Sequence, residues 1–418
     1  MWNGARARGT AGRPMRSVLA RGLVLVLVAA AAAFVAGGAP AGAATASGAA
    51  PATHVLGGDT VPVVHLVSPT SFTVLGPFAI GETTLTLPTD GAPVEVWYPA
   101  TQAAVAGGAV ASYDVKTWLP PALQKLIPAG FSVTFPSGGV RDIAVAPGRF
   151  PLVLFSHGFA GFRDQSAFLT AFLATWGFVV AAPDHYSRDL TEVLGGPTGA
   201  TAKTTDVGDL EATVTLMAHE NAMAASPFHG HVDTTKVGAV GHSDGGVAVE
   251  ALAAVDPKVA TFIGLAGATV GLPGDAKHGP DSIVPHQPGL LMSGTADTVV
   301  PTAGMVTAYG KMHAPKRLIL IKGAGHLVFA DICEIGAGQG GLLAIATALK
   351  VPIPASLKPL ATDGCNPPDL PVTQGWPVVR QAVTAELRHV FGFDATTAGL
   401  SGLVGAYPNV VSADESKS

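Results

Sequence analysis

Three side chains in the second half of the sequence have the types and the order needed for nucleophilic catalysis. Ser243 lies in a Gly-x-Ser-x-Gly motif at residues 241–245, and Asp297 and His326 follow it 54 and then 29 residues later. A serine hydroxyl is a poor nucleophile until a base takes its proton, and a histidine base needs a carboxylate to orient it. The pattern therefore predicts acyl transfer through a triad of Ser243, Asp297 and His326.

The residues around Ser243 predict how it is presented. An apolar run at 237–240 precedes the motif, and an Ala/Val-rich segment at 247–255 reads as a helix. Strand, sharp turn and helix together form the nucleophile elbow of α/β-hydrolases, in which the acid and the histidine follow the serine along the chain. Glycines at 241 and 245 permit the strained turn, and the helix N-terminus favours a developing negative charge.

Asp297 and His326 each follow a predicted buried strand, at 289–292 and 318–321 respectively. Both are therefore expected at the carboxyl edge of a parallel sheet, the edge at which the elbow also lies. Other roles stay open for each: Asp297 would also suit a cap for a predicted helix at 302–312, and His326 an ordinary loop position. Asp331, five residues after His326, is the rival acid.

An oxyanion hole needs two main-chain N–H donors, one from the residue after the nucleophile and one from an early strand-end loop. These are predicted to be Asp244 and, within the loop at 157–160, Phe159. A carboxylate beside a developing oxyanion is electrostatically unfavourable. The Asp244 side chain is therefore expected to point away from the site.

The remaining pattern predicts an α/β fold. Apolar strands alternate with amphipathic helices, which favours a mainly parallel central sheet with helices on both faces. The predicted strands are 151–155, 178–182 and 259–265, the predicted helices are 167–176, 206–223 and 377–391, and an antiparallel N-terminal edge is predicted at 78–87 and 94–98. Residues 112–139 are interrupted by prolines and read as a surface excursion, or as the border of a substrate cleft.

Six segments resemble the plasma-type (isoform II) platelet-activating-factor acetylhydrolase family. They are residues 76–81, 94–100, 151–163, 177–187, 241–246 and 325–329, of which 155–163 followed by 177–182 is the most specific part. Actinobacterial cutinase-like polyester hydrolases share the framework. The resemblance implies carboxylester hydrolysis by a Ser/Asp/His triad without a metal, and it places an oxyanion donor at Phe159. Asp244 replaces the bulky apolar residue usual in the family, which leaves the acyl preference open.

The sequences of the two chain ends predict segments outside the catalytic domain. Five arginines precede an uncharged run of 14 residues and Ala-x-Ala sites, so residues 1–43 read as a secretory signal peptide. The run is shorter than a membrane-spanning helix, although a retained anchor is the alternative. Residues 44–70 are predicted to be a flexible arm, 71–395 the catalytic domain and 396–418 a tail.

Removal of the leader would take away five arginines and no acids, and would change the formal net charge from −5 to −10. An acidic secreted protein is a poor candidate for binding nucleic acid or anionic membranes. No metal or other cofactor is predicted, because His185, His229 and His231 lack a third ligand at a coherent spacing.

Cys333 and Cys365 are the two cysteines, and in a secreted chain such a pair predicts a disulfide. They close most of an insertion predicted at residues 333–372. That insertion is too apolar to be a solvated loop, so one face must be buried. It is expected either to form a wall of the acyl pocket or to pack on the outside of the domain.

These observations predict a secreted serine carboxylesterase that acts on small-molecule or lipid-like esters. The resemblance makes 1-alkyl-2-acetylglycerophosphocholine one substrate to consider. A cutinase-like polyester hydrolase is the alternative within enzymes, and a catalytically silent binding protein is the alternative from another class. The oligomeric state cannot be inferred from the sequence.

Overall fold

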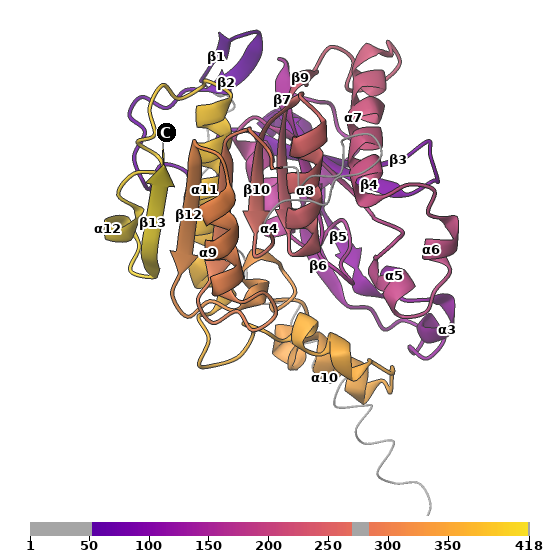
Figure 1. Cartoon of the computed structure of the whole chain (residues 1–418). Coiled ribbons are helices and arrows are strands. Elements are labelled where there is room, and N and C mark those ends of the chain that lie inside the picture. The colour runs from indigo at the N-terminus through magenta and orange to yellow at the C-terminus, as the bar shows by residue number, and fades with distance from the viewer. Residues whose placement is uncertain (1–51, 270–283, 417–418) are drawn as a thin grey trace, which may run out of the picture. The chain divides into compact units, whose positions relative to one another are not determined.

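The computed structural model describes residues 52–269 and 284–416, and its centre is an 11-stranded sheet (Figure 1). The predicted signal peptide lies outside the described residues. Six parallel strands form the middle of the sheet in the spatial order β8 (Val179–Pro183), β7 (Phe150–Ser156), β9 (Val232–His242), β10 (Val259–Leu265), β11 (Gly289–Gly294) and β12 (Lys316–Ile321). These strands read as continuous apolar runs because both of their faces are buried.

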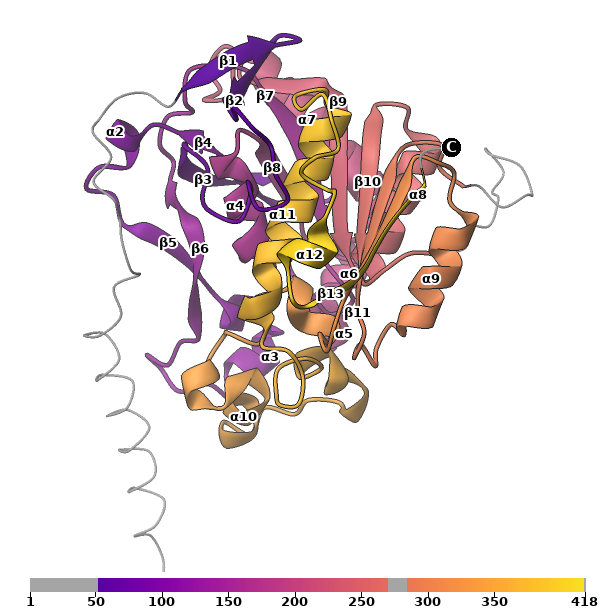
Figure 2. The same ribbon diagram turned by 90° about the vertical axis from the view of Figure 1, so that its left-hand side faces the viewer.

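Helices cover both faces of the sheet (Figures 1 and 2). One face packs against α4 (Ala167–Thr175) and α11 (Val372–Val390). The other packs against α7 (Asp206–Ala222), α8 (Asp244–Val255) and α9 (Thr302–Lys311). Successive side chains of a strand point to opposite faces, so Val153 joins the first core and Leu152 the second. The predicted α/β-hydrolase fold is thus confirmed.

The N-terminal edge is antiparallel, as predicted, and it is wider than predicted. β3 (Ala79–Thr86) pairs with β4 (Pro93–Ala100), and β4 pairs with β8. Residues 112–139 had been expected to be irregular, yet β5 (Val110–Asp114) and β6 (Thr134–Arg141) extend the sheet by two strands. Pro136 made β6 hard to predict from the sequence, because proline argues against a strand except near a sheet edge.

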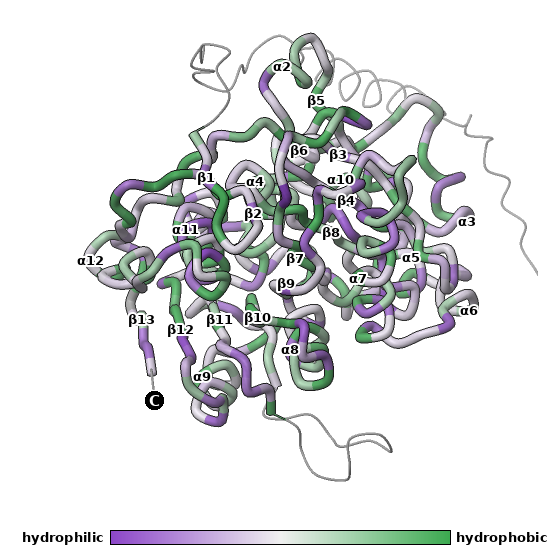
Figure 3. The backbone as a smooth tube through the Cα atoms, turned by 90° about the horizontal axis from the view of Figure 1, so that it is seen from above, coloured by the Kyte–Doolittle hydropathy of each residue, from purple (hydrophilic) through white to green (hydrophobic). Residues whose placement is uncertain are grey.

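Strands also form in the two segments that flank the predicted catalytic domain of residues 71–395. Within residues 44–70, predicted to be a flexible arm, β1 (Thr53–Leu56) and β2 (Asp59–Pro62) form a hairpin, and β2 is buried. At the other end β13 (Val410–Ser416) adds to β12 as an antiparallel edge strand rather than forming a tail. The C-terminal end of β13 is hydrophilic (Figure 3).

Helix α11 begins at Val372, five residues before the predicted start at Pro377. The prediction placed proline in the first turn, where it is most common, but Pro377 lies inside the helix. The short elements are α2 (Gln102–Val105), η2 (Val115–Trp118), α3 (Pro121–Gln124), α5 (Leu190–Val193), α6 (Thr198–Thr201) and α12 (Leu403–Ala406). Within residues 52–269 and 284–416, no helix combines the length and apolar character needed to cross a membrane.

The insertion after β12 is folded and crosslinked. It follows η3 (His326–Phe329) and contains η4 (Ala337–Gln339), α10 (Gly341–Ala348), η5 (Ala355–Leu357) and η6 (Pro359–Ala361). Cys333 and Cys365 form the predicted disulfide, with an Sγ–Sγ distance of 2.07 Å. Figure 2 shows α10 beyond the ends of the central strands, near α3 and α5.

Candidate active site

Ser243 occupies the sharp turn between β9 and α8. Its backbone has φ 56° and ψ −124°, a strained conformation for a residue with a side chain. A Cβ atom at Gly241 would lie 2.0 Å from the Gly245 carbonyl oxygen, and one at Gly245 would lie 2.0 Å from the Ser156 carbonyl oxygen. The two glycines of the motif therefore allow the close backbone packing that holds the elbow.

The structure brings His326 and Asp297 together. The Nδ1 atom of His326 lies 2.9 Å from Oδ2 of Asp297, and both side chains are buried. The other carboxylate oxygen accepts hydrogen bonds from the main-chain N–H groups of Val299 and Val300, at 2.9 and 2.7 Å. Asp297 is thus held rigidly, and its hydrogen bond to Nδ1 leaves Nε2 of the imidazole available for proton transfer.

His242, the residue before Ser243, contacts His326. The rings of His242 and His326 lie 4.6 Å apart, and Nε2 of His242 is 3.2 Å from the His326 carbonyl oxygen. Within the part of the chain that the structure describes, the Ser243 hydroxyl makes no hydrogen bond to His326. Such contacts are often long in the absence of substrate and tighten when it binds.

The structure places the two predicted oxyanion donors beside the nucleophile. A Cβ atom at Gly158 would lie 3.1 Å from the Ser243 Cβ, so the loop of Phe159 lies against the elbow. Among the described residues, the main-chain N–H groups of Phe159 and Asp244 have no acceptor. The Asp244 side chain is exposed and forms no ion pair among these residues.

A buried chain of hydrogen bonds connects the oxyanion loop to the main-chain carbonyl of His326. The Gly158 N–H donates to Oε1 of Gln165 at 3.2 Å, and Nε2 of Gln165 donates to Nδ1 of His242 at 2.9 Å. His242 then donates from Nε2 to the His326 carbonyl. Burial lowers the pKa of His242 well below its ordinary value, so its ring stays neutral and can both accept and donate.

A second network supports the same loop from behind. Ser156 Oγ lies 2.9 Å from Nε2 of His185, whose Nδ1 lies 2.9 Å from Oδ2 of Asp209. These three side chains are almost completely buried, so they cannot meet a substrate. Arg188 donates to Ser156 Oγ and to the His157 carbonyl. The arrangement resembles a triad, but its position makes it a support for the oxyanion loop.

Two of the three histidines considered as metal ligands, His185 and His231, are engaged in other contacts. Ligand atoms of His185, Asp206 and Asp209 lie within 4.8 Å of one another. Asp206 is paired with Arg188 at 2.5 Å, and His185 is hydrogen-bonded to Asp209. His231 contacts the Gly148 carbonyl through Nδ1 at 2.6 Å.

Asp331 does not face the imidazole. Both of its carboxylate oxygens accept from the main-chain N–H of Phe168 at the start of α4, at 3.2 and 3.3 Å. Burial raises its pKa well above the ordinary value. The acid that contacts His326 is Asp297.

Sequence reasoning missed one polar residue of the site. Asp363 accepts a hydrogen bond from the main-chain N–H of His326 at 2.5 Å, and its other oxygen accepts from the main-chain N–H of Thr298 at 3.1 Å. Its own carbonyl accepts from the Leu327 N–H at 3.0 Å. Its position two residues before Cys365 was the available signal, since a disulfide there fixes the segment.

Two family models match parts of the chain. Residues 78–194 match "Platelet-activating factor acetylhydrolase, isoform II", and residues 142–295 match "Chlorophyllase". The first match contains the loop of Phe159, and the second contains both that loop and the elbow of Ser243. No curated protein matches the chain.

Among solved structures, a ferulic acid esterase from Streptomyces cinnamoneus is similar to this chain. The sequence identity is 21%, and the similarity covers 75% of this chain and 90% of the esterase with a TM-score of 0.48. The sheet topology shows an α/β-hydrolase fold, and parts of the chain are similar to platelet-activating factor acetylhydrolase, isoform II, and to chlorophyllase.

Proposed function

We propose that this protein is a serine carboxylesterase whose triad is Ser243, Asp297 and His326. The observation that carries the proposal is the buried hydrogen bond of 2.9 Å between His326 and Asp297, next to the strained elbow that presents Ser243. A histidine oriented in this way can take the serine proton during attack.

In the proposed reaction, Ser243 Oγ attacks the ester carbonyl carbon while His326 Nε2 takes the hydroxyl proton. The carbonyl oxygen becomes an anion, and the main-chain N–H groups of Phe159 and Asp244 donate to it. Collapse of the intermediate breaks the bond to the alcohol oxygen, which receives the proton from His326. Water then enters by the same steps, releases the acid and restores Ser243.

The substrates are proposed to be lipid-like or short-acyl esters. The match of residues 78–194 to platelet-activating factor acetylhydrolase, isoform II, supports this proposal, and the disulfide agrees with a secreted protein. Secretion itself is part of the proposal, since the leader lies outside the described residues. A polymer-directed hydrolase is the competing enzyme, and a silent binding protein is the competing class.

A hydrolysis assay separates these candidates. Purified residues 44–418 would be assayed with p-nitrophenyl acetate and butyrate, and in parallel with a polyester film. Turnover of the small esters without release from the film supports the proposal. Preferential release from the film would favour the polymer-directed enzyme, and an absence of turnover on both would favour the silent binding protein.

A further inference from the structure

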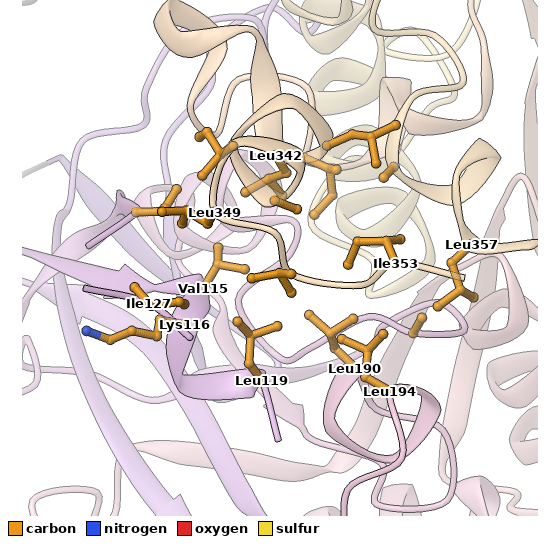
Figure 4. Close-up of a pocket in the computed structure, with 18 of the residues that line it drawn as sticks. Val115, Lys116, Leu119, Ile127, Leu190, Leu194, Leu342, Leu349, Ile353 and Leu357 are labelled. Carbon is orange, nitrogen blue, oxygen red and sulfur yellow. The ribbon is translucent and has the colours of Figure 1, made fainter. Parts of the chain in front are cut away.

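An apolar cavity lies beside the oxyanion loop. Its empty volume, counting the open mouth, is about 960 Å³. One wall comes from residues 115–133, between β5 and β6, and the opposite wall comes from residues 342–361 of the disulfide-closed segment (Figure 4). Ala160 and Phe162 of the oxyanion loop also line it.

The two walls present branched aliphatic side chains to each other. Figure 4 shows Leu119 and Ile127 from the first wall, and Leu349 and Ile353 from the second, around one space. Several of them are half-buried, which is unusual for so many leucines and isoleucines outside a core. The insertion thus turns its apolar face toward a cavity.

The cavity offers no charged partner for a head group. Lys116 is its one charged lining residue among those described. The ammonium of Lys116 donates to the Phe131 carbonyl at 3.2 Å and pairs with Asp114 at 3.8 Å, so it is already engaged. The lining therefore suits a hydrocarbon chain and not a phosphate, a carboxylate or a sugar.

The position of Ala160 indicates which part of an ester would enter. Ala160 lines the cavity and directly follows Phe159, the proposed oxyanion donor. An ester carbonyl held by that donor would therefore lie close to one end of the cavity. The chain attached to the carbonyl carbon can then extend into it. We propose that this cavity binds the acyl chain, and that the substrates are esters of unbranched aliphatic acids longer than acetate. This inference rests on the proposed function.

The disulfide gives the second wall its rigidity. The segment is tied at Cys333 and Cys365 and by the hydrogen bonds of Asp363 to the loops of His326 and Asp297. A wall that is already ordered loses little conformational freedom when a chain binds. The cavity is therefore expected to exist before the substrate arrives.

The test compares two ester series. In the first, p-nitrophenol is constant and the acyl chain grows from acetyl to decanoyl. The value of kcat/KM should rise roughly fourfold per added methylene, as expected when each CH₂ group is buried, until the cavity is filled. In the second series the acyl group is acetyl and the alcohol chain grows, and only a small change is expected. A rise confined to the alcohol series would overturn the acyl assignment.

Substitutions on each wall locate the effect. Ile127→Trp and Leu349→Trp fill the cavity from opposite sides, and each should lower kcat/KM for the octanoyl ester about tenfold or more while acetyl ester hydrolysis stays within twofold. Leu126→Trp is the matched control, because Leu126 is exposed and does not line the cavity. Equal losses on both esters, or an effect of the control as large as that of Ile127→Trp, would contradict the proposal.

A binding measurement separates this inference from the proposed function. Decanoate should bind to Ser243→Ala as it does to the unaltered protein, and Ile127→Trp should weaken this binding at least tenfold. Binding that is unchanged by both wall substitutions would overturn the cavity. Retained hydrolysis by Ser243→Ala would instead overturn the triad and leave the cavity result intact.

Discussion

The carboxylate of Asp363 accepts a hydrogen bond from the main-chain N–H of His326 at 2.5 Å. The same carboxylate also binds Thr298, the residue after Asp297, so one side chain of the disulfide-closed segment joins both loops of the acid–histidine pair. Gly364 packs directly against Gly325, where a Cβ atom would lie 2.5 Å away. The insertion is therefore a structural part of the site.

We expect Asp363→Ala to act through the position of His326. Loss of the bridge should lower kcat roughly 10- to 100-fold through misplacement of the imidazole, with KM for the acetyl ester nearly unchanged. Asp363→Asn keeps an acceptor and should retain more activity. Lys358→Gln, at an exposed position of the same segment, is the control. A change in KM alone, or no change at all, would argue against a positioning role.

The orienting acid is expected to be Asp297. Asp297→Asn would favour the wrong imidazole tautomer and should lower kcat by about 10⁴. Asp331→Asn should leave kcat within a few-fold, since Asp331 binds the start of α4. The measurement is kcat of the two variants under steady-state conditions. A large loss of kcat in Asp331→Asn together with a nearly unchanged kcat in Asp297→Asn would show that Asp331 is the orienting acid.

Removal of the disulfide should affect stability and long-chain substrates together. Closing a loop of 32 residues stabilises a protein by about 3 to 4 kcal/mol in the chain-entropy model. The double variant Cys333→Ser/Cys365→Ser should therefore melt at a lower temperature. If the segment walls the cavity, octanoyl ester hydrolysis should fall more than acetyl ester hydrolysis. Equal losses on both esters would leave the segment a structural crosslink only.

Asp59 should make stability depend on pH. Burial, followed by the negative charge of Asp233, raises the pKa of Asp59 from 3.8 to about 7. Between these values the folded protein binds more protons at this site than the unfolded chain, so the contribution of Asp59 to stability falls as pH rises. Asp59→Asn cannot ionise, so this fall in stability with rising pH should be absent from the variant.

The melting temperature of Asp59→Asn relative to the unaltered protein should therefore increase from pH 4 to pH 7 and level off above it. Thermal unfolding at a series of pH values measures this difference. The exposed Glu211→Gln is the control and should show no such trend. A flat or falling difference for Asp59→Asn would contradict the expected sign.

The fold could be predicted from the sequence wherever local pattern reflects burial. The segments at 237–240, 289–292 and 318–321, which precede Ser243, Asp297 and His326, are apolar runs within largely buried strands. The elbow was visible because its two glycines stand at fixed positions on either side of the serine, where they allow close backbone contacts.

Other features depend on contacts far along the chain. Asp363 binds His326 across 37 residues, and only its position near Cys365 hints at this contact in the sequence. β5 and β13 are the edge strands of the sheet and β6 lies next to β5, and all three have weak apolar periodicity. The cavity forms only where residues 115–133 and 342–361 lie opposite each other, and the sequence of neither segment predicts that contact.

The most direct test of the proposed triad is covalent labelling with a fluorophosphonate, followed by peptide mass spectrometry. The account predicts one adduct, on the peptide that contains Ser243, with loss of ester hydrolysis in proportion to labelling. It also predicts that Ser243→Ala is unlabelled and loses about 10³-fold or more in kcat. Labelling at another serine, or hydrolysis by Ser243→Ala within about tenfold of the unaltered protein, would contradict it.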